Sequence, residues 1–153
     1  MDDKITQSAK TAYGTLLAML DEKKVNYVKS EKDLSVDFRI DGDNGDMGIF
    51  IFIDVKRSLV RLFAQVPLRF DGNRRLDGAI ATSLANYSLA DGSFDFDYNT
   101  GRILFRMTSG FADSTLSKSV FEYMVAVTCY TVDEYMLKFS QLFNGKITLK
   151  NFS

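Results

Sequence analysis

The Asn44-Gly45 dipeptide most restricts how this chain can fold, because it lies between two apolar runs. Both residues tolerate the positive φ of a type I′ turn, so they predict the tip of a β-hairpin. The run before it, 34–40, alternates apolar and charged residues, which is the pattern of a half-buried strand. The run after it, 47–55, carries isoleucine and phenylalanine at alternate positions. The sequence therefore predicts a hairpin with two different faces.

The position of this turn also sets the register of the hairpin. With Asn44-Gly45 at the tip, three pairs are expected on one face: Ile40 with Ile49, Phe38 with Ile51, and Val36 with Ile53. Phe50 and Phe52 then point to the opposite face.

A second turn, near Lys56-Arg57, is expected to return the chain as a strand over residues 59–66. Pro67 ends this predicted strand, because proline cannot donate a hydrogen bond to a ladder. The strand adds four residues to the isoleucine face: Val60, Leu62, Ala64 and Val66. The other face receives Arg61, Phe63 and Gln65, with Phe63 opposite Phe50.

Apolar residues recur at helical spacing in three segments, 4–23, 72–88 and 115–143, which we predict to be helices. A short extended piece, 25–28, follows the first of them. The stripe expected on the last helix is Leu116, Val120, Tyr123, Met124, Val127, Thr131 and Tyr135. A second hairpin with its tip at 98–101 predicts the pairs Asp97 with Arg102, Phe96 with Ile103, and Phe94 with Phe105.

These elements predict an α+β fold in the order α-β-β-β-α-β-β-α. A twisted, mainly antiparallel sheet is expected to pack one face against amphipathic helices. The residues of that face are Ile49, Ile51, Ile53, Val60, Leu62, Phe94 and Phe96. No repeat and no long linker divides the sequence, so residues 1–153 are expected to form a single domain.

The residue types needed for common catalytic sites are missing. The chain contains no histidine, which removes the usual general base and the commonest zinc ligand. Neither of the common glycine-rich nucleotide-binding motifs occurs. The acidic turn 41–46 fails as a calcium loop, since Asp46 and Phe52 stand where glycine and glutamate are needed. We therefore predict a protein that is not an enzyme and has no catalytic, metal or cofactor site.

Charge and apolar content limit the class of partner. The 19 basic and 20 acidic residues give a formal net charge of -1, so no strong field attracts nucleic acid or an anionic membrane. No apolar run approaches the roughly 20 residues that span a bilayer. The first residues lack the features of a signal peptide, so a cytoplasmic location is expected. Neither nucleic acid nor membrane is the expected partner.

The candidate binding site is the sheet face opposite the isoleucines. The predicted register brings Phe50, Phe52 and Phe63 together, with Arg39 and Arg61 beside them. The helices in this order cover one sheet face, so the rings are expected at the surface, where apolar patches usually mark interaction sites. Aromatic residues with arginine are also typical of binding hot spots. These five residues form the predicted partner-binding site.

Two alternatives stay open on the sequence alone. A helix that wraps to this side of the sheet would turn the phenylalanine cluster into a second core. A small-molecule sensor would instead bind its ligand in a pocket between the sheet and the last helix, near Tyr123, Met124 and Tyr135.

Three segments carry a resemblance to a known family. The stretch Ala-Asn-Tyr-Ser-Leu-Ala-Asp-Gly-Ser-Phe-Asp-Phe-Asp at 85–97, followed by Gly-Arg-Ile at 101–103 and Asp-Glu-Tyr at 133–135, resembles the YbjN family of bacterial proteins. That family is described as sensory transduction regulators. On this resemblance the matched positions are structural: Asn86 caps the second helix, and Gly92 and Gly101 relieve turns.

The YbjN family is similar in architecture to the type III secretion chaperones. These are small acidic proteins that dimerise and hold secreted partners in a partly unfolded form. The resemblance implies a regulator-like or chaperone-like module that binds a protein partner and forms a homodimer. It implies no catalytic residue.

Overall fold

The computed structural model describes residues 3–152 and contains one sheet with three helices packed against it. The helices are α1 (Asp3–Glu22), α2 (Arg75–Ser88) and α3 (Lys118–Phe143). The strands are β1 (Tyr27–Ser30), β2 (Ser35–Gly42), β3 (Gly45–Asp54), β4 (Leu59–Arg69), β5 (Ser93–Asp97) and β6 (Arg102–Gly110). Two short 3₁₀ helices, η1 (Gly72–Arg74) and η2 (Leu149–Asn151), precede α2 and follow α3. The predicted α+β class is confirmed.

The sheet has the strand order β1-β2-β3-β4-β6-β5, and all neighbouring strands are antiparallel. The predicted order omitted β1, which forms where only a short extended piece was expected. This strand pairs with β2 and lies at one edge of the sheet. The predicted pairs of the second hairpin, including Phe94 with Phe105, are confirmed.

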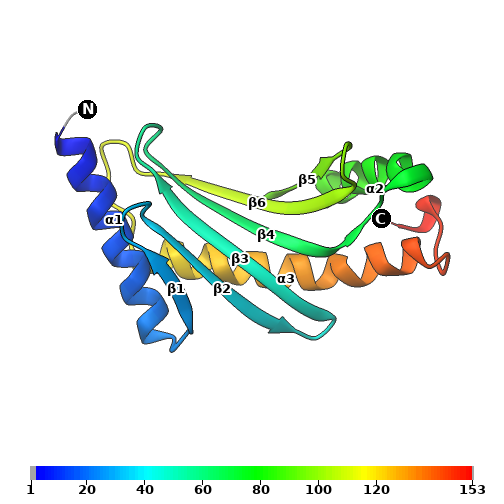
Figure 1. Cartoon of the computed structure of the whole chain (residues 1–153), viewed down its shortest axis with the longest axis horizontal. Helices are drawn as coiled ribbons and strands as arrows, with labels where there is room; N and C mark the ends of the chain where they lie inside the picture. The colour runs from blue at the N-terminus through cyan, green and yellow to red at the C-terminus, as the bar shows by residue number, and fades with distance from the viewer. Residues whose placement is uncertain (1–2, 153) are drawn as a thin grey trace.

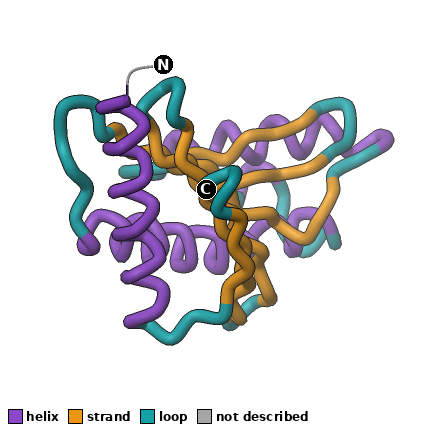
Figure 2. Tube along the Cα trace, turned by 60° about the vertical axis from the view of Figure 1, so that its left-hand side comes forward, coloured by secondary structure: helices purple, strands orange, loops and turns teal. Residues whose placement is uncertain are grey.

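All three helices pack on the same face of the sheet, here called the covered face. Figure 1 shows α3 running along the sheet, with α1 near the beginning of α3 and α2 near its end. Helix α3 contacts β2, β3, β4 and β6, while α1 contacts β3 and α3, and α2 contacts β5. Figure 2 shows α1 beside the beginning of α3, in agreement with the contacts between these two helices.

The covered face is aliphatic in its centre, as predicted. Ile49, Ile51 and Ile53 of β3 are each at most 3% exposed, because α1 and α3 lie over them. On β4 the buried residues are Val60, Leu62, Ala64 and Val66. The period of two in both strands thus assigns these side chains to the correct face.

The buried stripe of α3 differs from the predicted one. Its buried residues are Phe121, Met124, Thr128, Thr131, Val132, Tyr135, Met136, Phe139 and Leu142. Leu116 precedes the helix, and Tyr123 is 51% exposed. Apolar residues occur on nearly every side of this helix, so spacing alone left its orientation open.

The first hairpin also has a different register from the predicted one. Gly42 pairs with Gly45, so the two-residue loop is Asp43-Asn44, and Phe38 lies opposite Ile49. Neither Asp43 nor Asn44 has a positive φ, so the turn is not of type I′. The shift amounts to two residues, which leaves every side chain on its predicted face.

The predicted end of β4 at Pro67 is also wrong, because the strand continues to Arg69. Between Gln65 and Arg69 the pairing with β6 changes register. An irregularity of this kind accommodates a proline, because one residue of the ladder no longer needs to donate.

Candidate functional site

The five residues of the predicted site all lie on the sheet face opposite the helices, here called the open face. Phe50 lies directly opposite Phe63, and Phe52 lies opposite Arg61. The Phe50 and Phe52 rings are 5.6 Å apart between centroids, and the Phe52 and Phe63 rings are stacked at 6.3 Å with their planes 12° apart. The predicted register thus brings the three rings into one cluster.

Arg61 contacts two of the three rings through its guanidinium group. Its guanidinium carbon lies 5.4 Å from the centre of the Phe52 ring and 5.3 Å from that of Phe63. Such cation–π contacts stabilise a partly exposed pair by about 0.5–1 kcal/mol. The side chain also shields part of both rings, so each phenylalanine is half-buried rather than fully exposed.

A buried carboxylate fixes the position of Arg61. Asp54 lies 3.6 Å from the Arg61 guanidinium and accepts hydrogen bonds from the backbone N–H and the guanidinium of Arg57, at 3.1 and 3.0 Å. Burial raises the pKa of the Asp54 carboxyl, but the hydrogen bonds from Arg57 and the charges of Arg57 and Arg61 outweigh it. Its pKa therefore lies below the ordinary value, and the carboxylate stays ionised near neutral pH.

Arg39 lies apart from the ring cluster, over a glycine. It is opposite Gly48, and a Cβ added to that glycine would approach the Arg39 guanidinium to 3.4 Å. The missing side chain leaves room for the guanidinium above the strand. A shallow hollow of about 480 Å³ adjoins it, with Val28 and Asp37 in its wall. The predicted site thus has a charged end beside its aromatic part.

Sequence reasoning missed Val28 as part of this face. Val28 pairs with Asp37, which lies opposite Phe50, so it continues the row of Phe50 and Phe63 to the sheet edge. Its side chain is 75% exposed. The short extended piece expected at 25–28 was the available signal. Assigning it as a strand paired with the one over 34–40 would have placed Val28 on this face.

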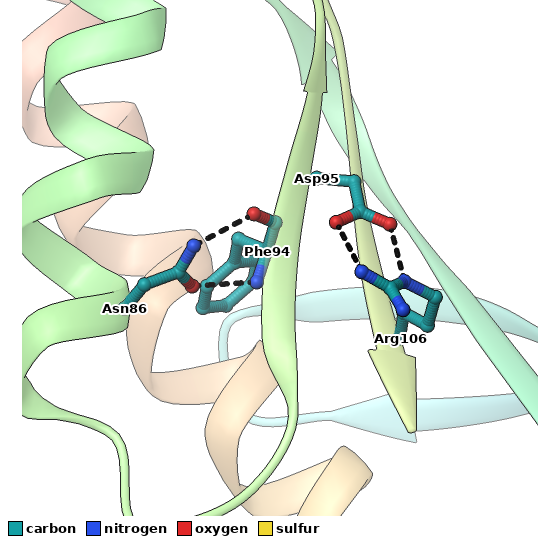
Figure 3. Close-up of polar contacts among 4 residues, drawn as sticks. All are labelled: Asn86, Phe94, Asp95 and Arg106. Carbon is teal, nitrogen blue, oxygen red and sulfur yellow. Dashed lines mark hydrogen bonds and ion pairs between the residues drawn. The ribbon is translucent and has the colours of Figure 1, made fainter. Parts of the chain in front are cut away.

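An ion pair occupies the side of the open face near β5. The Asp95 carboxylate binds the Arg106 guanidinium through two hydrogen bonds of 2.7 and 3.1 Å (Figure 3). The Arg106 guanidinium donates both hydrogen bonds, and these bonds together with the negative charge of Asp95 raise the pKa of Arg106. Arg106 lies opposite Phe63, so this pair borders the ring cluster.

Asn86 does not cap α2, contrary to the prediction. Its side chain reaches from α2 to β5, where it accepts from the Phe94 N–H at 2.7 Å and donates to the Phe94 carbonyl at 2.9 Å (Figure 3). It thereby pairs with one backbone unit that β6 leaves free, at the outer edge of the sheet. Gly92 and Gly101 both have φ near +74°, as expected for the turns they occupy.

The two alternatives left open by the sequence have different outcomes. Phe50, Phe52 and Phe63 are outside both the buried core cluster and the apolar residues packed against it, so no described helix covers the open face. Of the residues proposed to line a ligand pocket, Met124 and Tyr135 are packed in the core. Tyr123 is instead exposed, and its hydroxyl donates to the Asp91 carboxylate at 2.9 Å. These residues therefore do not surround a common cavity.

Residues 3–152 contain neither a cluster of metal-ligating side chains nor a helix that could span a membrane. No group of three or more Cys, Asp or Glu side chains in this range is arranged to hold a metal ion. No helix in the same range has the length and apolar character needed to cross a membrane.

No family model matches this chain, and no curated protein matches its sequence. Solved structures with the same fold exist. One is a chain in the crystal structure of the ExsC-ExsE complex, with a TM-score of 0.61 and 16% identity over 84% of this chain and 92% of that chain. Another is a chain in the HopA1-SchA chaperone-effector complex, with a TM-score of 0.57 and 17% identity over 89% of this chain and 94% of that chain.

Identities of this size are evidence for the fold alone. The predicted chaperone-like α+β architecture is therefore confirmed, whereas the resemblance to the YbjN family stays a prediction.

Proposed function

We propose that this chain is a non-catalytic protein-binding module, regulator-like or chaperone-like, that holds a partner polypeptide on its open sheet face. The observation that carries this proposal is a cluster of three phenylalanine rings on a face that no described helix covers. An apolar patch of this kind usually marks an interaction site.

The composition of the open face supports a protein partner. Phe50, Phe52 and Phe63 offer ring surface without a deep cavity, and Arg61 spans two of the rings. Aromatic residues with arginine are the types most enriched in binding hot spots. The face is also broad and only shallowly hollowed, which suits a polypeptide better than an enclosed small ligand.

The structural neighbours give independent support for a binding role. One of them belongs to a chaperone-effector complex, and the other belongs to a two-protein complex. By analogy of fold, this chain is proposed to bind a protein in a similar way. Homodimer formation and a cytoplasmic location are further parts of the proposal and come from the sequence. Light scattering tests the first, since a homodimer has twice the mass of the 17.3 kDa chain.

The test compares which proteins are captured by the original chain and by a variant that lacks two rings of the open face. A tagged chain is used to isolate proteins from a lysate of the source cells, with identification by mass spectrometry. The double substitution Phe52→Ser with Phe63→Ser is expected to keep the circular dichroism spectrum and lose the captured protein. Both rings contribute to the patch without belonging to the core, so folding survives their removal.

A matched control is available on the outside of α3. Tyr130 and Leu137 are 73% and 45% exposed, so Tyr130→Ser with Leu137→Ser removes a similar apolar area from another surface. This control is expected to capture the same protein as the original chain. Equal capture by the open-face variant, or loss of capture in the control alone, would refute the proposed site.

A further inference from the structure

Two arginines face each other on the open face at the end of β4. Arg69 pairs directly with Arg102 of β6, and both side chains are exposed. Like charges in directly opposite positions of a sheet destabilise it. The irregularity between Gln65 and Arg69 creates this pair, because an uninterrupted register would set Pro67 opposite Arg102.

No ion pair within residues 3–152 neutralises this pair, although the charge of Arg102 is one of the causes that lower the pKa of Asp97. Neither Arg69 nor Arg102 has a carboxylate within ion-pair distance. Asp97 lies opposite Arg102 on its other side, but its carboxylate accepts from the Thr100 hydroxyl at 2.7 Å and the Asn99 N–H at 3.0 Å. The nearby acid is thus engaged in its own turn. The two guanidiniums have donors free for an anion from outside.

Two other arginines of the open face, unlike Arg69 and Arg102, do form ion pairs with carboxylates of this chain. Arg61 is paired with Asp54, and Arg106 binds Asp95 through two hydrogen bonds. Arg39, at the opposite side of the ring cluster, has no carboxylate within ion-pair distance among the described residues. Near the rings the open face therefore carries two paired arginines, together with the exposed Asp37, which has no ion pair among the described residues. Its unpaired arginines lie farther from the rings.

The spacing between the rings and the arginine pair fits one extended segment. Arg106 lies opposite Phe63, and Arg102 stands four residues away on the same strand. At about 3.3 Å per residue, the Arg69–Arg102 pair lies roughly 13 Å along β6 from the ring cluster. Apolar side chains and carboxylates about four residues apart in an extended partner would therefore reach both places.

We propose that the segment bound on the open face is acidic, with apolar side chains that contact the phenylalanines and carboxylates that bind Arg69 and Arg102. The inference rests on the proposed function and adds the chemistry of the partner. Arginine forms paired hydrogen bonds with carboxylates, and these are stronger than bonds between neutral groups.

A nucleic acid would offer anions as well, but the open face fits it less. Stacking platforms for single strands lie in basic grooves, and the whole chain has a net charge of -1. Here the Phe52 and Phe63 rings stack on each other and under Arg61, rather than standing free to receive bases.

The experiment uses synthetic peptides of about twelve residues, measured by fluorescence anisotropy with the full chain. The acidic probe carries leucine at alternate positions in its first half and glutamate at alternate positions in its second half, with serine elsewhere. Alternate side chains point to the same side of an extended peptide. In the two control peptides, glutamine or lysine replaces every glutamate. The acidic peptide is expected to bind about tenfold more tightly than the glutamine peptide, and the lysine peptide more weakly than both.

Substitutions separate this inference from the proposed function. Arg69→Gln with Arg102→Gln is expected to weaken the acidic peptide about tenfold and leave the glutamine peptide unchanged. Phe52→Ser with Phe63→Ser is expected to weaken binding of both peptides.

Equal affinity for the three peptides would overturn the acidic preference while leaving the proposed function intact. Failure of every peptide to bind would count against both. Tighter binding of an oligothymidine, with displacement of the acidic peptide, would overturn the choice of a protein ligand.

Discussion

Both faces of β3 carry large apolar side chains, but these side chains differ in burial. Ile49, Ile51 and Ile53 are buried under α1 and α3, whereas Phe50 and Phe52 stay half-buried with no helix above them. Hydrophobicity alone therefore does not decide which face becomes the core. The number of helices and their connections decide it, because three helices pack on one side of the sheet and leave the other side free.

The open face is adapted to contact with water in a way that the covered face is not. Phe52 and Phe63 stack on each other and share the guanidinium of Arg61, while Asp54 holds that guanidinium in place. The ion pair of Asp95 and Arg106 borders the rings, so charged groups lie beside them. A surface of this composition limits the contact of the rings with water and still leaves ring area exposed.

The largest expected effect comes from a matched pair of substitutions on adjacent residues of β4. Leu62 is fully buried on the covered face, so Leu62→Ala should lower the free energy of unfolding by about 3 kcal/mol. Phe63, on the open face, loses only partly buried area, so Phe63→Ala should cost about 1 kcal/mol. Urea unfolding followed by circular dichroism measures both. Equal losses would mean that the open face is a second core.

A smaller effect is expected at the buried carboxylate. Asp54→Asn should lower the free energy of unfolding by about 1 kcal/mol at pH 7, because it removes a charged acceptor from Arg57 and Arg61. The pKa of Asp54 is lower in the folded state than its ordinary value, so this contribution is present above about pH 4. It is lost as the pH falls through the folded pKa. Unfolding curves of both proteins should therefore converge in acid, and a constant difference would contradict the assignment.

The smallest effect is expected for the exposed pair of Asp95 and Arg106. Their side chains are 43% and 41% exposed, so solvent screens most of the interaction. A double-mutant cycle with Asp95→Asn and Arg106→Gln should give a coupling of about 0.5 kcal/mol. About 1 M salt should reduce it further, since screening shortens the range of exposed charges. A coupling unaffected by salt would show that the pair is effectively buried.

The sequence predicts the faces of the sheet better than its register. Phe50 and Ile51 are assigned to opposite faces by alternation, which a shift of two residues leaves unchanged. The hairpin turn itself depends on a distant contact, because the Asn44 N–H donates to the Asp133 carboxylate at 2.8 Å. Those two residues are 89 positions apart, so no local pattern reports their contact.

The candidate site is predictable only in part for the same reason. Strand alternation brings together the phenylalanines and Arg61, whereas Arg69 meets Arg102 through an irregularity near Pro67. A proline marks a break in the ladder, but it does not show which residues pair beyond the break. Asn86 was expected at a helix cap, its commonest role, but its amide binds the backbone of β5. Both features depend on how separate elements approach one another.

Site-specific photocrosslinking to the captured partner tests most directly whether the open face is the binding surface. A benzophenone amino acid replaces Gln65, which is exposed on the open face beside Phe63, or Tyr130, which is exposed on the outside of α3. Neither substitution removes a residue of the ring cluster. The partner is expected to crosslink at position 65 and not at position 130. Crosslinking at position 130 alone would show that the partner binds the helical side, and that the open face is not the binding surface.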